Sequence, residues 1–131
     1  MKGLLLDTHA LLWMVLDHPR LPKRARTQIE RTARLVYSAA SFWEIGLKLS
    51  RGGFDFALPH AWHDELIREL RGIGVSRLEI EPEHCRRLQD LPWHHKDPFD
   101  CMLVAQAQVE GLTILSADRR FKNYDVPVAW G

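Results

Sequence analysis

Long apolar runs and cysteine motifs are both missing from this chain of 131 residues. The apolar stretch near its N-terminus, residues 4–16, is interrupted by Asp7, so it is too short to span a membrane as a helix. The two cysteines, Cys85 and Cys101, form no Cys-x-x-Cys pair of the kind that binds zinc. Because the N-terminus also lacks the pattern of a signal peptide, the sequence predicts a protein of the reducing cytoplasm with no membrane partner.

An excess of charge of one sign is missing as well. The chain has 18 lysines and arginines against 17 aspartates and glutamates, which gives a formal net charge of +1. No strong overall field therefore drives binding to nucleic acid or to a membrane, although a local basic face is compatible with this balance. Internal repeats, linkers and glycine-rich phosphate loops are also absent. With a hydrophobic share of 46%, the sequence predicts one globular domain over residues 1–131.

Short apolar segments alternate with helical patterns along the chain. The segments expected to form strands are residues 2–6, 35–38, 75–80, 112–115 and 126–128. The segments expected to form helices are residues 10–16, 23–32, 41–49, 59–71, 82–91 and 98–110, with a short helical turn at 118–121. Strands that alternate with helices are typical of a mainly parallel sheet covered on both faces. The sequence therefore predicts an α/β fold with three layers, α/β/α.

Acidic residues recur where an expected strand ends and a helix begins. These acids are Asp7 after the first strand, Glu44 after the second, Asp118 after the fourth, and Asp97 and Asp100 at the start of helix 98–110. Because the carboxyl ends of parallel strands meet at one edge of the sheet, we expect these side chains to gather there. Crowded carboxylates repel each other unless a divalent cation lies among them, and oxygen ligands suit Mg²⁺ or Mn²⁺. The pattern indicates a metal-dependent site for one ion or two.

Helix capping is the alternative explanation for each acid taken singly. Asp7 or Thr8 can cap the first helix, and Ser41 with Glu44 fits a capping box. Asp97 stands before Pro98, as an N-cap residue commonly does, and the remaining acids suit first turns. Caps outnumber active sites in any protein, but the shared placement of all the acids favours one common site.

The chain resembles a PIN-domain ribonuclease, and more closely a VapC-type toxin of a type II toxin–antitoxin pair. The segments that carry the resemblance are Leu4–Trp13, Ser38–Ile45, His95–Asp100 and Leu115–Asp118. Each segment alone is weak evidence for the family, whereas the order of the segments and their placement at strand ends are specific to it. The resemblance extends to Pro127–Trp130 and so covers nearly the whole chain.

The resemblance implies an acidic quartet that binds Mg²⁺ or Mn²⁺ for endoribonuclease chemistry. It carries over onto Asp7, Glu44, Asp100 and Asp118, and a metal-activated water would hydrolyse an RNA phosphodiester bond. Asp97 ranks below Asp100 as a metal ligand and is kept as a ligand or capping candidate. The implied protein partners are a cognate antitoxin and a second copy of the chain in a homodimer.

Several polar residues beside the acids are candidates for substrate binding. Thr8 and Ser116 can bind a metal water, or they can be plain helix caps. Lys48 and Arg51 follow Glu44 by four and seven positions on the same helix face. They can contact RNA phosphates, or Lys48 can simply pair with Glu44.

Two further basic or polar pairs complete the candidates. Arg119–Arg120 is another possible phosphate contact, directly after the last acid of the quartet. His94–His95 invites a zinc interpretation, but a solvated loop is the better prediction because no second pair of zinc ligands follows at a suitable spacing.

Two other functions stay open on the sequence alone. A phosphatase-like hydrolase also places acids at strand ends, but it needs Asp-x-Asp after the first strand, and this chain has Asp7-Thr8-His9. A non-catalytic binding module would use the acids only as helix caps. Tight binding of Mn²⁺ would separate a converging quartet from a set of caps.

Overall fold

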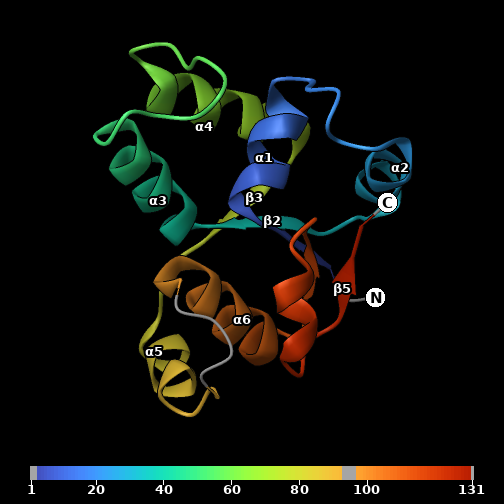
Figure 1. Cartoon of the computed structure of the whole chain (residues 1–131). Helices are drawn as coiled ribbons and strands as arrows, with labels where there is room; N and C mark the ends of the chain where they lie inside the picture. Colours follow the sequence, from blue (N-terminus) through green and yellow to red (C-terminus); the bar gives the residue numbers. More distant parts are fainter. Residues whose placement is uncertain (1–2, 93–96, 131) are drawn as a thin grey trace.

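The strands form one parallel sheet in a computed structural model that describes residues 3–92 and 97–130 (Figure 1). The expectation for His94–His95 lies outside the described residues. The strands are β1 (Leu4–Leu6), β2 (Leu35–Ser38), β3 (Ser76–Leu78), β4 (Thr113–Leu115) and β5 (Val128–Ala129). Their order across the sheet is β3-β2-β1-β4-β5, and every neighbouring pair is parallel.

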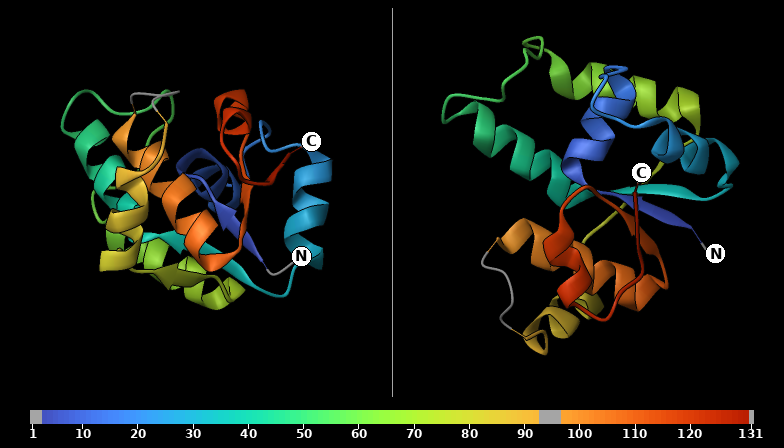
Figure 2. Two further views of the ribbon diagram at one scale, coloured as in Figure 1. Left: turned by 90° about the horizontal axis from the view of Figure 1, so that it is seen from below. Right: turned by 45° about the vertical axis from the view of Figure 1, so that its right-hand side comes forward.

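Helices cover both faces of this sheet. They are α1 (Thr8–Val15), α2 (Lys23–Arg31), α3 (Ala39–Leu49), α4 (Trp62–Ile73), α5 (Pro82–Gln89) and α6 (Pro98–Glu110), with a 3-10 helix η1 (Arg119–Asn123). Helices α1 and α4 lie on one side of the sheet, and α5 and α6 lie on the other (Figure 1). The left view of Figure 2 looks at the molecule from the side that α5 and α6 cover. The predicted three-layer α/β/α fold is confirmed.

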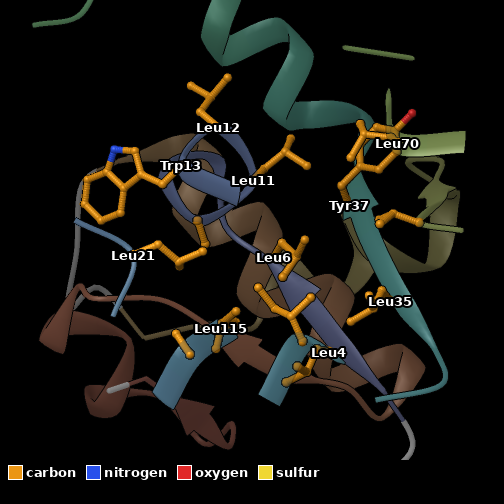
Figure 3. Packing of buried hydrophobic residues seen from close by; sticks show 14 of the residues in the cluster. Leu4, Leu6, Leu11, Leu12, Trp13, Leu21, Leu35, Tyr37, Leu70 and Leu115 are labelled. Carbon is orange, nitrogen blue, oxygen red and sulfur yellow. The ribbon is translucent and has the colours of Figure 1, made fainter. Parts of the chain in front are cut away.

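Strand β1 lies at the centre of the sheet and joins two hydrophobic clusters. Its three leucines have no exposed surface, because both faces of a central parallel strand are covered. Leu4 and Leu6 point to the cluster under α1–α4 (Figure 3), whereas Leu5 points to the cluster under α6 and η1. This alternation follows from the two-residue period of a strand.

The register of the three central strands brings their carboxyl ends level. Leu6 pairs with Tyr37 of β2 and with Leu115 of β4. The residues that come next along the chain, Asp7 and Ser116, therefore leave the sheet at the same edge. The expectation that the strand ends meet at one edge is confirmed.

Helix α3 begins earlier than predicted. Strand β2 runs directly into the helix, and Ser38 is the cap because its Oγ accepts from the Ala40 amide at 3.0 Å. The predicted capping box of Ser41 and Glu44 is therefore wrong. Both residues lie inside the helix and face the protein interior.

Helix α4 starts and ends later than predicted. Residues 59–61 make a turn before it, in which the Trp62 amide donates to the Pro59 carbonyl at 3.1 Å. Gly74 provides the left-handed cap, with a φ of +87° that favours glycine. Strand β5 lies at the edge of the sheet and spans Val128–Ala129, so it starts later than the expected strand 126–128. In the part of the chain that the structure describes, no helix has the length and apolar character needed to cross a membrane.

Candidate functional site

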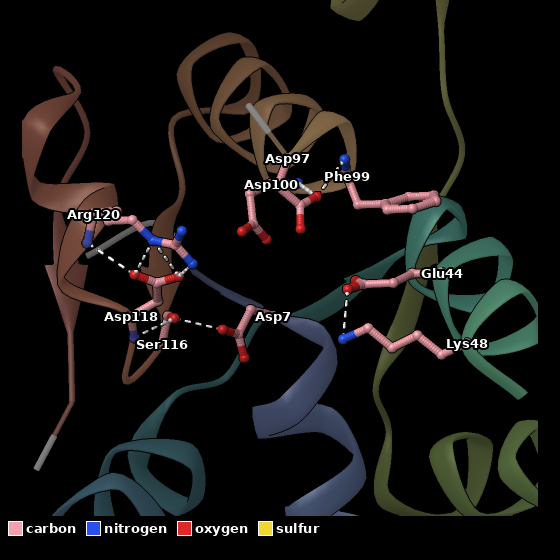
Figure 4. Close-up of polar contacts among 9 residues, drawn as sticks. All are labelled: Asp7, Glu44, Lys48, Asp97, Phe99, Asp100, Ser116, Asp118 and Arg120. Atoms are coloured by element: carbon pink, nitrogen blue, oxygen red, sulfur yellow. Dashed lines mark hydrogen bonds and ion pairs between the residues drawn. The ribbon is translucent and has the colours of Figure 1, made fainter. Parts of the chain in front are cut away.

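A pocket of about 350 Å³ opens at the carboxyl edge of the sheet. We call it the site pocket and define it by its lining residues. These are Asp7, Thr8, His9, Trp13, Arg20, Glu44, Lys48, Asp97, Asp100, Ala117, Asp118 and Arg120. All five acids singled out by the sequence line it, although they come from α1, α3, α6 and η1 or from the residues just before these helices (Figure 4).

Asp7 is one of the two buried acids of the pocket and follows directly after β1. It caps α1, because its Oδ1 accepts from the Ala10 amide at 2.8 Å, and its Oδ2 accepts from the Ser116 hydroxyl. Burial raises the pKa of Asp7 to about 7; the two hydrogen bonds oppose this shift, whereas Asp100 and Glu44 add to it. The charged form of Asp7 therefore needs a nearby positive charge.

Glu44 lies one turn inside α3 and caps no helix. Its side chain is buried, although charged residues are rarely buried without a partner. One carboxylate oxygen accepts from the Thr8 hydroxyl at 2.5 Å, and the other lies 3.2 Å from the Lys48 ammonium. The Ser41 hydroxyl lies 3.0 Å from that of Thr8. Helix capping accounts for other acids of the pocket but not for Glu44.

Asp97 and Asp100 stand together at the start of α6. Asp97 is the cap, because its Oδ1 accepts from the amides of Phe99 at 2.9 Å and of Asp100 at 3.2 Å. Asp100 occupies the first turn, and its carboxylate points into the same space as that of Asp7 (Figure 4). Its negative charge is one of the causes that raise the pKa of Asp7, so the two side chains are within electrostatic reach.

Asp118 lies on the opposite wall from Glu44 and is held by Arg120 (Figure 4). It caps η1 by accepting from the Arg120 amide at 2.9 Å, and the Arg120 guanidinium spans both carboxylate oxygens, at 2.8 Å from Nη2 to Oδ2 and 3.1 Å from Nε to Oδ1. The Ser116 hydroxyl accepts from the Asp118 amide and donates to Asp7, so it links the two acids.

Three basic side chains line the pocket beside the acids: Arg20, Lys48 and Arg120. Arg51, which the sequence placed with Lys48, lies in the turn after α3 and is not among the lining residues. Sequence reasoning missed Arg20, which pairs with Asp55 at 2.5 Å. Arg20 lies in a loop, and contacts 35 positions apart leave no local pattern, so no signal in the sequence marks it.

His9 and Trp13 form an aromatic side of the pocket. The His9 ring lies 5.6 Å from that of Trp13 and 5.9 Å from that of Phe54. Burial lowers the pKa of His9, which favours the neutral ring. These contacts give His9 a packing role beside the acids.

The donor set of the pocket fits a hard divalent cation. Carboxylate and hydroxyl oxygens are the ligands that Mg²⁺ and Mn²⁺ prefer. As the side chains stand, however, no three acidic, histidine or cysteine side chains among residues 3–92 and 97–130 are close enough to hold an ion. Glu44 and Asp118 are instead balanced by Lys48 and Arg120. A cation would have to replace these two as the counter-charge.

Fold and site together define a class of protein: a three-layer α/β domain with a parallel sheet and an acidic pocket at the carboxyl edge of that sheet. Residues 4–127 match the family model of the PIN domain, and the chain belongs to the PIN-domain family. The resemblance stated from the sequence motifs is thereby confirmed.

Known proteins are similar to this chain over nearly all of its length. Ribonuclease VapC22 of Mycobacterium tuberculosis is 26% identical over 129 residues, which cover 97% of this chain and 95% of the relative. VapBC2 of Rickettsia felis, solved with a DNA fragment of its promoter, has a similar chain with a TM-score of 0.71 at 12% identity, covering 98% and 99% of the two chains. DNA-bound VapBC of Salmonella typhimurium gives 0.69 at 14% identity, covering 98% of each chain. At this level of identity the solved structures are informative about the fold alone.

Proposed function

We propose that the protein is an endoribonuclease and the toxin of a VapBC-type toxin–antitoxin pair. One observation carries the proposal: four acids from separate segments, Asp7, Glu44, Asp100 and Asp118, line one pocket together with basic side chains. The acids suit a divalent cation that would neutralise negative charge developing at a phosphate, and the basic side chains suit the phosphate itself. The name of the mycobacterial relative, a ribonuclease, supports RNA as the substrate.

The activity is proposed to depend on Mg²⁺ or Mn²⁺, held by the acidic quartet of Asp7, Glu44, Asp100 and Asp118. When bound, such a cation lowers the pKa of an attacking water and neutralises charge that develops on the phosphate. The raised pKa of Asp7 supports this assignment, because a buried carboxylate among other acids is stabilised in its charged form by a cation.

Other residues of the pocket position the quartet. Ser116 fixes one oxygen of Asp7, and Thr8 fixes one oxygen of Glu44, so both acids present their remaining lone pairs in a set direction. Arg120 and Lys48 are assigned to the substrate phosphate. The phosphate would compete with Asp118 for Arg120 and with Glu44 for Lys48. Thr8 and Ser116 are thus positioning residues.

Capping alone is the competing interpretation, and one acid speaks against it. Asp7, Asp97 and Asp118 do cap helices. Glu44 caps nothing, yet it is buried with a carboxylate that lines the same pocket. Burying a charge costs free energy even when Thr8 and Lys48 are its partners, and no helix end requires Glu44 here, which is typical of a functional site.

A cognate antitoxin is the proposed protein partner, and a homodimer is the proposed assembly. One solved structure with a similar chain is named as a toxin–antitoxin complex from Klebsiella pneumoniae, and two others are named as VapBC2 of Rickettsia felis and VapBC of Salmonella typhimurium. Co-expression with the product of a neighbouring small gene, followed by size-exclusion chromatography with light scattering, tests both parts of this proposal.

Cleavage of a total-RNA pool tests the enzymatic proposal. Purified protein with Mn²⁺ should give discrete products, and EDTA should abolish them. Asp7→Asn and Asp100→Asn should each slow cleavage at least about 100-fold, because each removes a charge from the reaction centre. Far-UV circular dichroism of both variants should match the wild type.

Asp125→Asn is the matched control, because Asp125 is exposed and lies outside the pocket. It should cleave at the wild-type rate. If Asp7→Asn or Asp100→Asn cut the same RNA as fast as this control does, the site is wrongly assigned.

A further inference from the structure

A second and larger hollow adjoins the site pocket. It has a volume of about 1070 Å³ and lies between α2, η1 and β5. Ala117 and Asp118 line both hollows, so the two meet at these residues. We call this hollow the basic groove. Its basic lining side chains are Arg24, Arg31, Arg34, Arg119 and Lys122.

The charge of the basic groove is one-sided. All five basic residues are exposed, whereas Asp118, at the junction with the site pocket, is the one acid among the lining residues. Within the described residues, Arg24, Arg31, Arg119 and Lys122 have no acidic partner within 4.0 Å, and only Arg34 reaches one, Glu110, at that limit. Unpaired cations that share one hollow repel each other, so the groove favours an anion with several charges.

Helix α2 presents its cations along one wall. Arg24 and Arg31 are seven positions apart, so they lie on the same side of the helix, about 10.5 Å apart along its axis. Between them, Gln28 donates from Nε2 to the carbonyl of Trp130 at 3.0 Å. This bond ties α2 to the chain beyond β5, which lines the same groove.

Two separate elements, α2 and η1, supply the basic side chains of the groove. Arg119 and Lys122 extend from η1, while Arg24 and Arg31 extend from α2. A linear polyanion can contact both walls in succession, whereas a single small anion contacts only one or two of the cations. The near-zero net charge of the whole chain makes this concentration local.

We propose that the basic groove binds the sugar-phosphate backbone of single-stranded RNA and leads it past Ala117 and Asp118 into the site pocket. This inference rests on the proposed ribonuclease function. It deepens that function by assigning a backbone path to residues outside the acidic pocket. The contacts are to phosphates, so they fix the position of the strand and carry no base preference.

Salt dependence of RNA binding tests the proposal. Binding of a labelled 20-nucleotide single-stranded RNA is measured by fluorescence anisotropy from 50 to 300 mM KCl, with EDTA present so that nothing is cleaved. Each lost phosphate contact reduces the magnitude of the negative slope of log K against log salt by about 0.7. Arg24→Gln with Arg31→Gln, and separately Arg119→Gln with Lys122→Gln, should each reduce that magnitude by about 1.4.

Arg86→Gln with Arg87→Gln is the matched control. Both arginines are exposed on α5, at the other end of the molecule from α2 in Figure 1, and the pair removes the same charge. The control should keep the wild-type slope. The proposal is overturned if the groove variants keep that slope too, or if the control lowers it equally.

Two further outcomes keep the inference separate from its alternatives. If the groove variants lose affinity for a poly-glutamate peptide while their RNA slope is unchanged, the groove binds an acidic polypeptide and the RNA proposal is wrong. If the wild-type protein never cleaves RNA but the slope differences hold, the ribonuclease proposal fails and the RNA-binding groove stands.

Discussion

Asp7 shows at the scale of one residue how burial sets the chemistry of the pocket. Its carboxyl group is withdrawn from water and faces other acids, which together raise its pKa from 3.8 to about 7. In the folded protein the proton stays on Asp7 over a pH range in which the unfolded chain has already lost it. Ionisation of Asp7 therefore works against folding when no cation is present.

The direction of this pKa shift predicts how stability depends on pH in the wild type and in Asp7→Asn, both in EDTA. The native state holds the extra proton between pH 4 and pH 7, so the contribution of Asp7 to stability is full below pH 4 and is lost as pH rises to about 7. The free energy of unfolding of the wild type should fall relative to that of Asp7→Asn by roughly 3–4 kcal/mol over this range, since each pKa unit corresponds to about 1.4 kcal/mol.

Urea denaturation from pH 4 to pH 8 measures this difference. Asp125→Asn serves as the control, and its difference from the wild type should stay flat with pH because Asp125 is exposed. A flat difference for Asp7→Asn as well would show that burial of Asp7 does not disfavour its charge.

Arg120 is the second residue whose contacts lead to a prediction. Its guanidinium spans both oxygens of Asp118, and the acid raises the pKa of the arginine further. A cation must displace this contact, so Arg120→Gln should tighten Mn²⁺ binding roughly fivefold in calorimetric titration. Arg119→Gln removes the same charge without this contact and should have a smaller effect. Weaker Mn²⁺ binding by Arg120→Gln would place Asp118 outside the metal site.

At the scale of elements, strands and the long helix were predictable because their signals are local. Strand β2 and helix α6 have the predicted bounds, since an apolar run and a Pro-headed helix ending before Gly111 leave few alternatives. The start of α3 was not predictable in this way. Ser38 is both the last residue of β2 and the helix cap, and Ser41 looks equally suitable in the sequence.

The gathering of the acids was predictable for a topological reason. Parallel strands send their carboxyl ends to one edge, so Asp7 and Asp118 follow from the order of elements alone. The basic residues that line the pocket beside the acids could not be predicted from the order of elements. Arg20 reaches the pocket from a loop, and Arg51 misses it because α3 ends at Leu49. Such contacts depend on the path of the chain in space, which a local pattern does not record.

Variants of Asp97 can distinguish a capping role from a metal-binding role at the start of α6. Two amides of α6 depend on its Oδ1, so Asp97→Ala should lower the free energy of unfolding by about 1 kcal/mol. Asp97→Asn keeps an oxygen that can accept and should stay within a few tenths of a kcal/mol of the wild type.

Metal titration of the same variants completes this test. Asp97→Asn should weaken Mn²⁺ binding less than Asp100→Asn does, because the Asp97 oxygen is already engaged with the amides of Phe99 and Asp100. Equal losses would make Asp97 a ligand rather than a cap.

At the scale of the whole molecule, the sheet couples the pocket to both hydrophobic clusters. Strand β1 contributes Leu6 to one cluster and Leu5 to the other, and Asp7 follows directly at its end. The walls of the pocket come from α1 and α3 on one side and α6 on the other. A ligand that joins these walls therefore stabilises both halves of the fold at once.

Thermal unfolding should record this coupling as one transition that Mn²⁺ shifts. A ligand at 100 times its Kd stabilises the native state by about 2.7 kcal/mol, which corresponds to a rise in Tm of roughly 10 °C for a chain of this size. Differential scanning calorimetry should show a single peak with and without Mn²⁺, because the central sheet belongs to both clusters. Asp7→Asn should remove most of the shift, whereas Asp125→Asn should keep it. A shift of equal size in Asp7→Asn would place the bound ion elsewhere, and two separate peaks would show that the layers on either side of the sheet unfold independently.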